Sequence, residues 1–362
     1  MLTFELMNDT KTILVAPLNW GLGHATRCIP MIHALIDNGF RPLIASDGIA
    51  LQLLEKEFPS VETLALPGYK IQYAKKGKNF KWKMLKDSPK MMKAVTKERK
   101  VIKQWVKDGR IDGIISDNRL GVYHKKVPSV FMTHQLNVLT GKTTWLSSKG
   151  HQRIINKFDE CWVPDMAHSP NLTGKLGHLK KPKKNTKYIG PLSRFEKKEA
   201  EKKYGLMVIL SGPEPQRTML EDRLFEEVKH FDGKVLFVRG KVEEKQQYFQ
   251  NLNIDIYNFM TSDQLELAFN QSAMVLSRSG YTTIMDLAKL GKKAFFIPTP
   301  GQYEQEYLAK RLKKQGLVPW STQEKFHIDR LNEIDLYKGL TQFHTAEDLG
   351  SLFGLFEGKG KL

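Results

Sequence analysis

The sequence predicts an α/β protein with two Rossmann-like, doubly wound domains that face each other across a cleft. Short apolar segments alternate with segments of helical periodicity twice, over residues 11–163 and again over residues 206–318. Such alternation is typical of βαβ units around a parallel sheet. A chain of 362 residues usually forms two domains. The Lys-rich polar stretch Gly174–Lys187 lies between the two series and is the best linker candidate.

The first series opens with an apolar strand at Lys11–Leu18 and a helix that ends near Asn38. A basic segment then interrupts the alternation before it resumes. The remaining strands are expected at Pro42–Ser46, Val61–Leu66, Ile111–Ser116, Ser129–Met132 and Cys161–Val163, with helices at Ile49–Glu57, about Ser88–Lys107 and Thr143–Lys157.

The second series follows the short strand Tyr188-Ile189 and the charged run Glu196–Lys203. Its strands are expected at Leu206–Leu210, Val235–Val238, Ile254–Tyr257, Met274–Leu276 and Ala294–Ile297. We therefore expect an N-terminal domain at residues 1–187, a C-terminal domain at 188–330 and a helical tail at 331–362.

Composition argues against several protein classes. Two cysteines, Cys28 and Cys161, do not make a disulfide scaffold and fit a reducing compartment. No segment approaches the roughly 18 apolar residues of a membrane span, and residues 1–10 do not read as a signal peptide. The ten histidines are scattered and neither cysteine has a C-x-x-C partner. We therefore expect a cytosolic protein without a metal site or cofactor.

The net charge of +18 is concentrated between Lys70 and Lys107, which hold fourteen Lys or Arg and only two acids, Asp87 and Glu98. Aromatic residues and methionines are interleaved with these cations. This composition suits an anionic surface, either lipid headgroups or nucleic acid, although a solvated helical face of a basic protein would read the same way. The residues expected at such a surface are Lys81, Trp82, Lys83 and Lys86.

Two neighbouring strand-to-helix turns in the second series predict a ligand site. The first is the segment Ser277–Asp286 and the second is Pro298–Glu306. Open α/β sheets bind ligands at this edge, and the free amides of a helix N-terminus suit a phosphate. The phosphate-binding candidates are Ser279, Gly280, Thr282 and Thr283. Asp286 and Glu304 offer carboxylates to sugar hydroxyls, although a first-turn acid such as Asp286 is also favoured by the helix dipole.

Further loops at the carboxyl ends of predicted strands are expected to line the same cleft. The loop Gly21-Leu22-Gly23-His24 permits close backbone approach, and His24 could deprotonate a hydroxyl; the alternative is a capping histidine beside a structural turn. The polar pairs Asp117-Asn118 and His134-Gln135 each follow a strand. In Ser211–Arg217, amides near Gly212 and the Arg217 guanidinium could hold a diphosphate, unless this is simply a Pro-rich turn.

Taken together, these loops resemble those of GT-B glycosyltransferases. The likeness is strongest to the family 28-like branch with the bacterial peptidoglycan N-acetylglucosaminyltransferase and the diacylglycerol galactosyltransferases. The matching segments are Gly21–His24, Thr133–Asn137, the interdomain turn Gly190–Arg194, Ser211–Arg217 and Ser277–Asp286, the last against the signature Ser-Arg-x-Gly-x-x-Thr-x-x-Glu.

The resemblance implies that the C-terminal domain holds the nucleotide. By this likeness Arg194 faces the donor, Phe259 and its backbone meet the base, Asp286 takes the ribose, and Glu304 and Gln305 contact the sugar. Asp286 stands where the family has Glu, and Glu304 stands where it has Gln, so the identity of the donor sugar is left open. The tail of such enzymes often returns to brace the first domain.

The resemblance also implies a metal-independent transfer of a sugar, UDP-linked in this branch, to a hydroxyl acceptor. A lipid-linked acceptor at the cytosolic face of the membrane would account for the basic segment. Two alternatives remain open at this point. One is a nucleotide-sugar 2-epimerase of the same fold; the other is a non-enzymatic protein that binds anionic surfaces or, less in keeping with the loops, nucleic acid.

Overall fold

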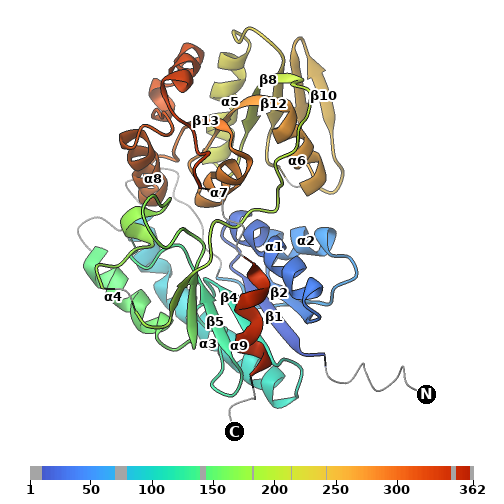
Figure 1. The fold of residues 1–362 in the computed structure, drawn as a ribbon, viewed down its shortest axis with the longest axis vertical. Helices are drawn as coiled ribbons and strands as arrows, with labels where there is room; N and C mark the ends of the chain where they lie inside the picture. Colours follow the sequence, from blue (N-terminus) through green and yellow to red (C-terminus); the bar gives the residue numbers. More distant parts are fainter. Residues whose placement is uncertain are drawn as a thin grey trace.

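A computed structural model describes residues 10–69, 80–138, 144–181, 183–212, 214–241, 243–343 and 348–358, with the backbone alone at 80–88 and 146. Two sheets, each flanked by helices, form the centres of two domains that lie one above the other in Figure 1. The strands are short runs of apolar residues because both faces of each sheet are covered. The two-domain α/β architecture expected from the sequence is therefore confirmed.

The first sheet has seven strands in the order β3-β2-β1-β4-β5-β6-β7, and all neighbours are parallel. Its strands are β1 (Thr12–Pro17), β2 (Arg41–Ser46), β3 (Thr63–Ala65), β4 (Gly113–Asp117), β5 (Ser129–Met132), β6 (Glu160–Val163) and β7 (Thr186–Tyr188). Its helices are α1 (Gly23–Asp37), α2 (Gly48–Glu57), α3 (Phe80–Lys107) and α4 (Thr144–Ile155), with the 3₁₀ turn η3 (Gly174–Leu176).

The second sheet has six strands in the order β10-β11-β9-β8-β12-β13. The strands are β8 (Tyr204–Ile209), β9 (Val235–Val238), β10 (Tyr248–Asn251), β11 (Ile254–Tyr257), β12 (Ser272–Ser277) and β13 (Lys293–Phe296). The helices are α5 (Gln216–Val228), α6 (Ser262–Gln271), α7 (Tyr281–Leu290) and α8 (Tyr303–Lys314), followed by the 3₁₀ helices η4 (Gln323–Lys325) and η5 (Ile328–Leu336). The antiparallel edge strand β10 was not predicted, because its four exposed residues lack an apolar pattern.

The chain ends on the first domain. After η5, which packs beside β13, the segments η6 (Leu349–Phe353) and α9 (Gly354–Glu357) lie across the lower domain in Figure 1. The Phe353 ring lies 5.6 Å from that of Phe40, and Phe356 contacts Trp162 edge-on at 6.3 Å. The tail contains short 3₁₀ turns for much of its length rather than the regular helices expected. The predicted domain boundary at 187/188 falls inside β7.

The basic segment contributes the long helix α3, which begins at Phe80 rather than near Ser88. The expected start near Ser88 was therefore too late, and Pro89 lies inside this helix. None of the helices in the described ranges is both long enough and apolar enough to cross a bilayer.

Candidate functional site

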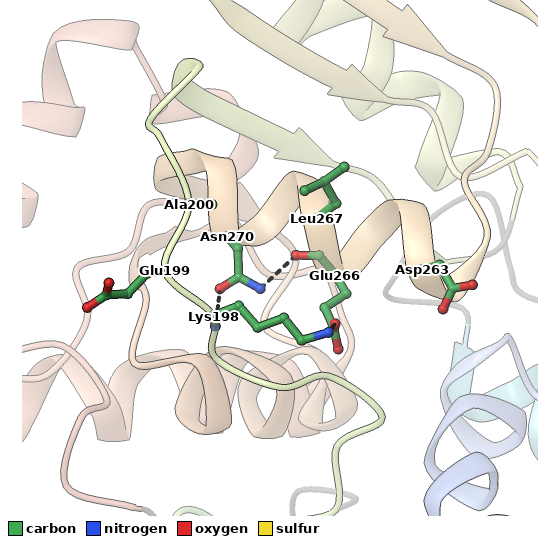
Figure 2. Close-up of a pocket in the computed structure, with 7 residues that line it drawn as sticks. All are labelled: Lys198, Glu199, Ala200, Asp263, Glu266, Leu267 and Asn270. Atoms are coloured by element: carbon green, nitrogen blue, oxygen red, sulfur yellow. Dashed lines mark hydrogen bonds and ion pairs between the residues drawn. The ribbon is translucent and has the colours of Figure 1, made fainter.

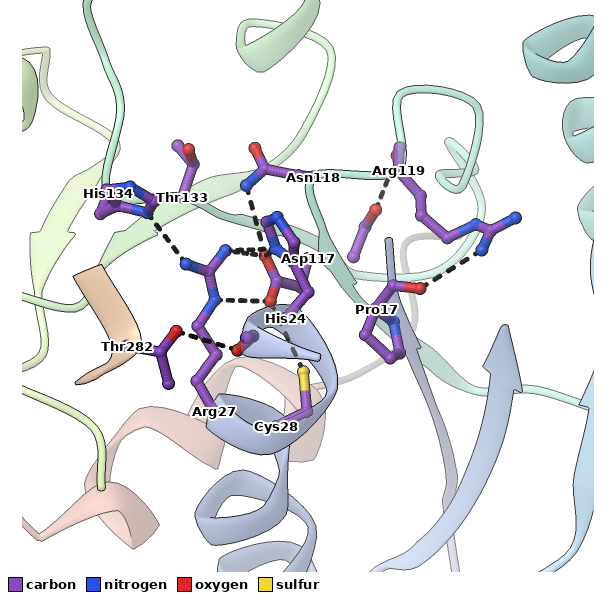
Figure 3. A network of polar contacts seen from close by, with 12 residues as sticks. Pro17, His24, Arg27, Cys28, Asp117, Asn118, Arg119, Thr133, His134 and Thr282 are labelled. Atoms are coloured by element: carbon purple, nitrogen blue, oxygen red, sulfur yellow. Dashed lines mark hydrogen bonds and ion pairs between the residues drawn. The ribbon is translucent and has the colours of Figure 1, made fainter. Parts of the chain in front are cut away.

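The candidate site lies where the carboxyl edge of the first sheet meets the second domain. The ends of β4 and β5 and the first turn of α1 come together there, and the first turns of α7 and α8 approach from the other domain (Figures 1 and 3). Thr282 Oγ1 in α7 donates a hydrogen bond of 3.0 Å to the carbonyl of Gly23 in α1. The two domains therefore touch directly at the predicted loops.

His24 lies in the first turn of α1, directly after a loop in which Gly21 has a φ of +76°. Its Nδ1 is 3.1 Å from Oδ1 of Asp117, the last residue of β4. Burial lowers the pKa of His24, so the ring is neutral near pH 7. Although burial acts in the opposite direction, Arg27 and His24 together lower the pKa of Asp117 to about 2. The pair is a neutral imidazole beside a permanent carboxylate, as a general base requires.

Arg27 connects this pair to the rest of the site (Figure 3). Its guanidinium donates two hydrogen bonds to the Asp117 carboxylate, from Nε to Oδ2 at 2.6 Å and from Nη2 to Oδ1. Its Nη1 lies 2.9 Å from Nδ1 of His134. Arg27 was missed in the sequence, where the only signal was one charged residue on the otherwise apolar buried face of α1, three positions after His24.

The tautomer of His24 decides its chemistry. Arg27 Nη2 lies 2.8 Å from the same Nδ1 that faces Asp117. If Nδ1 carries the proton and donates to Asp117, Nε2 is free to accept a proton from a substrate. If Nδ1 accepts from Arg27, Nε2 carries the proton and His24 is no base. The carboxylate of Asp117 can only accept and the guanidinium of Arg27 can only donate, so the two compete for this Nδ1, and a role of His24 as a base requires the arrangement in which Nδ1 donates to Asp117.

The predicted pair His134-Gln135 also lies in the site and reaches across to α8. His134 Nε2 is 3.0 Å from Oε1 of Glu304, and Gln135 Nε2 donates to Oε2. The His134 ring stacks on that of Tyr281, the first residue of α7, at 4.4 Å. Although burial opposes it, His134 lowers the pKa of Glu304, so this carboxylate is ionised at neutral pH.

The turn before α7 has the features of a phosphate site. No side chain caps α7 at Gly280, so its first amides have no capping partner of this kind. Ser279, however, is fully buried and its hydroxyl donates to the carbonyl of Gln305. The Gln305 side chain accepts from the amide of Thr299. Ser279 and Gln305 therefore shape the turn, and Gly280, Thr282 and Thr283 remain the candidates for phosphate contact.

Asp286 is nine-tenths buried one turn further along α7. It accepts a hydrogen bond of 2.8 Å from the Ser193 hydroxyl, which comes from the interdomain turn. Burial raises the pKa of Asp286 to about 7, while Arg194 acts in the opposite direction. The Arg194 Nε has no hydrogen-bond partner among the described residues. Asp286 and Arg194 thus lie near each other, and the Ser193 hydroxyl already occupies one oxygen of the carboxylate.

The structure corrects the role expected of Arg217. Its guanidinium is buried and donates to Glu214, Glu221, Thr218 and the carbonyl of Arg239. It therefore holds α5 to the neighbouring loops and is not free for a diphosphate. The spacing to Glu221, four residues on, is the helical ion-pair signal that could have shown this.

Three other predicted residues occupy different surroundings. Gly212 has a φ of +104° and open space on its side-chain side. The amide of Phe259 is held by Asn258 and its carbonyl by Gln246, so a base could contact only its ring without rearrangement. Asn118 follows Asp117 with a φ of +59° and borders the His24 site. The side chains of Lys81, Trp82, Lys83 and Lys86 lie outside the described residues.

A cavity of about 290 Å³ lies elsewhere, between the segment Lys198–Ala200 and α6 (Figure 2). Lys198 and Glu266 on its wall pair with each other, and Asn270 binds the Lys198 amide. None of the predicted site residues lines it. This cavity is therefore separate from the interdomain site.

Comparisons with known proteins agree with this geometry. Residues 214–340 match the model of the glycosyltransferase family 28 C-terminal domain. The UDP-N-acetylglucosamine--N-acetylmuramyl-(pentapeptide) pyrophosphoryl-undecaprenol N-acetylglucosamine transferase of Pasteurella multocida is 23% identical over 355 residues, covering 93% of this chain and 90% of that enzyme. The same enzyme of Haemophilus ducreyi is 22% identical over 226 residues, only 60% of either chain.

Solved structures extend the likeness to the whole fold. The glycotransferase of kitacinnamycin superposes with a TM-score of 0.64 at 14% identity, over 96% of this chain and 95% of that one. The GT-B fold and the resemblance inferred from the sequence are thereby confirmed.

Proposed function

We propose that this GT-B glycosyltransferase moves a sugar from a UDP-sugar to the hydroxyl of a lipid-linked acceptor at the inner face of the cell membrane. The relatives named above act with a UDP-sugar on an undecaprenol-linked acceptor, which supports this choice of substrates. The donor would lie on the C-terminal domain and the acceptor on the N-terminal one.

One observation supports the proposal: the candidate base His24 and the candidate phosphate turn before α7 lie on neighbouring elements of the two domains. The Thr282–Gly23 hydrogen bond brings the uncapped N-terminus of α7 next to the residue that precedes His24. A diphosphate on α7 would therefore present its sugar to the side on which the His24–Asp117 pair lies. This is the arrangement that transfer from a nucleotide sugar requires.

In the proposed reaction the acceptor oxygen attacks the anomeric carbon while the bond from that carbon to the β-phosphate oxygen breaks. His24 Nε2 takes the hydroxyl proton, and Asp117 stabilises the resulting imidazolium. The amides of the first α7 turn and the Arg194 guanidinium offset the charge that develops on the leaving UDP. We propose that these groups suffice without a metal ion.

A thermal-shift screen of nucleoside diphosphates and their sugars tests the donor site. A ligand that binds only the folded chain raises the melting temperature. We expect UDP and one or more UDP-sugars to stabilise the wild type. Replacing Asp286 with Ala should weaken binding at least tenfold, about 1.4 kcal/mol. A panel without any stabilising nucleotide would refute the proposal, and conversion of a UDP-sugar to its epimer without acceptor would favour an epimerase.

The membrane part of the proposal is supported by a basic band on the N-terminal domain. On α4, which contains no acid, exposed residues recur every four positions, so they share one face. They are Trp145, which is 72% exposed, Lys149, Arg153 and, just after the helix, Lys157. Arg99 of α3 lies 4.7 Å and Lys157 lies 6.0 Å from the Tyr123 ring, which joins this face to α3. A basic face with an exposed Trp suits anionic headgroups.

Sedimentation with phosphatidylglycerol vesicles tests this surface. We expect the double variant Arg153→Glu/Lys157→Glu to lose most vesicle binding, while Lys313→Glu/Lys314→Glu on α8 retains it at the same net charge. An equal loss of vesicle binding in both double variants would mean that net charge alone is responsible for the binding. Unchanged binding of Arg153→Glu/Lys157→Glu would mean that α4 does not contact the membrane.

A further inference from the structure

Each oxygen of the Glu304 carboxylate already accepts a hydrogen bond from the opposite domain. His134 binds one of its oxygens at 3.0 Å and Gln135 binds the other. The side chain of His134 is 7% exposed and that of Glu304 is 20% exposed, so these contacts are largely shielded from water. His134 and Gln135 therefore restrict the access of a sugar hydroxyl to the Glu304 oxygens.

Arg27 determines how His134 makes this contact. A guanidinium has only donors, so the His134 Nδ1 that lies 2.9 Å from Arg27 Nη1 must accept. The ring proton of the neutral imidazole is then on Nε2, where it points at Glu304. Because Asp117 holds the rest of the guanidinium, Arg27 has little freedom to turn away. The contact to Glu304 thus depends on a residue that touches neither Glu304 nor a ligand.

The second domain also fixes the ring. Tyr281 stacks on His134 at a centroid distance of 4.4 Å and an interplanar angle of 14°. The Tyr281 hydroxyl donates at 2.6 Å to the carbonyl of Pro164 in the first domain. His134 is therefore held in its plane by a stack and along its edge by two hydrogen bonds.

We propose that His134 and Gln135 form a clasp that holds Glu304 against the N-terminal domain in the donor-free chain. Arg27 is the positioning residue that fixes the required His134 tautomer. The donor sugar displaces this clasp to reach Glu304. The last part rests on the proposed function, since it takes Glu304 as the acceptor of sugar hydroxyls. Sugar recognition is then coupled to the loss of this one interdomain contact, while the Thr282–Gly23 hydrogen bond stays in place.

The binding test compares UDP-sugar with UDP by calorimetry. UDP lacks the transferred sugar and does not need Glu304, so its affinity should not respond to the clasp. We expect Gln135→Leu to raise the affinity for UDP-sugar severalfold, up to about tenfold, with UDP unchanged. The matched control Thr282→Ala also breaks an interdomain hydrogen bond but leaves Glu304 alone, and should shift both ligands by the same factor. A Gln135→Leu variant with an unchanged or reduced preference for UDP-sugar over UDP would overturn the clasp.

A second measurement needs neither ligand nor variant. Long-range ¹H–¹⁵N correlation of histidine-labelled protein should show His134 as the Nε2–H tautomer in the free chain. An Nδ1–H tautomer would overturn the role of Arg27. If no nucleotide binds at all, the proposed function fails, whereas this measurement still tests the role of Arg27 on its own.

Discussion

Thr282 Oγ1 and the carbonyl of Gly23 join the N-termini of α7 and α1 through a hydrogen bond of 3.0 Å. The approach is so close that a Cβ added to Gly23 would lie 2.9 Å from Thr282 Oγ1 and 3.5 Å from its Cβ. Because the φ of Gly23 is in the ordinary range, its backbone conformation does not require glycine. Glycine is required here because the two domains approach too closely for a side chain.

Replacing Gly23 with Ala should separate the two helices and slow sugar transfer by roughly tenfold or more, because misplacement of reacting groups is costly. Stability should hold or rise slightly, since alanine favours a helix. Steady-state kinetics and thermal unfolding measure the two effects. The additional change Thr282→Ala should recover part of the rate, and Gly150→Ala, where a Cβ meets nothing within 4 Å, should be neutral. A full rate in Gly23→Ala would contradict the requirement for close contact.

The His24–Asp117 pair predicts a loss in the chemical step. His24→Gln should lower kcat by a factor of roughly 10² to 10⁴ while UDP-sugar affinity stays near that of the wild type. Asp117→Asn should lower kcat similarly, because the two residues act as a unit, so the double variant should be no slower than the slower single one. Asp117→Asn should also lower the free energy of unfolding, since Arg27 is left without its buried charged partner. If His24→Gln retained full kcat, His24 would not be the base.

Much of the fold follows from the sequence because its central strands are buried on both faces. A strand such as β1, all six of whose residues are buried, is a continuous apolar run, and it could be placed to within a residue. The rule that ligands gather at the carboxyl edge of such strands then located His24, His134 and Gln135 correctly in one site.

The connections within the site could not be predicted in the same way. Arg27 meets Asp117, ninety residues away in the chain, only because β4 pairs with β1, the strand that leads into α1. The engagement of Asp286 by Ser193 and of Glu304 by His134 depends on how two domains close. Residue type and strand position predict which groups reach an edge, but not which of them bind each other.

Burial of Asp286 predicts a pH dependence of stability. Its pKa is raised from 3.8 to about 7 in the folded chain. Between these values the folded state holds a proton that the unfolded state has released, so the free energy of unfolding should fall as the pH rises through this window. The loss from this group is at most about 4 kcal/mol. Urea unfolding from pH 4 to pH 8 should show a steeper decline for the wild type than for Asp286→Asn; parallel curves would mean that Asp286 ionises normally.

Helix α3 is fastened to the first sheet by a buried ion pair, and its loss should destabilise the chain. The Glu98 carboxylate accepts from Arg119 Nε at 2.7 Å and from the Tyr69 hydroxyl at 2.8 Å, and both charged side chains are fully buried. Arg119 also donates to the carbonyl of Pro67, so one guanidinium ties the helix to the loop after β3.

Glu98→Gln leaves the Arg119 charge buried with its main partner neutralised, which should cost about 3 kcal/mol in the free energy of unfolding. Urea denaturation measures this cost. Lys100→Gln changes one exposed charge on the same helix and should stay within about 0.5 kcal/mol of the wild type. Because Arg99 of α3 belongs to the basic band, Glu98→Gln should also weaken vesicle binding at urea concentrations below the unfolding midpoint of this variant. Equal stability of the two variants would mean that Asp47, which receives Arg119 Nη1 at 2.8 Å, compensates the charge without Glu98.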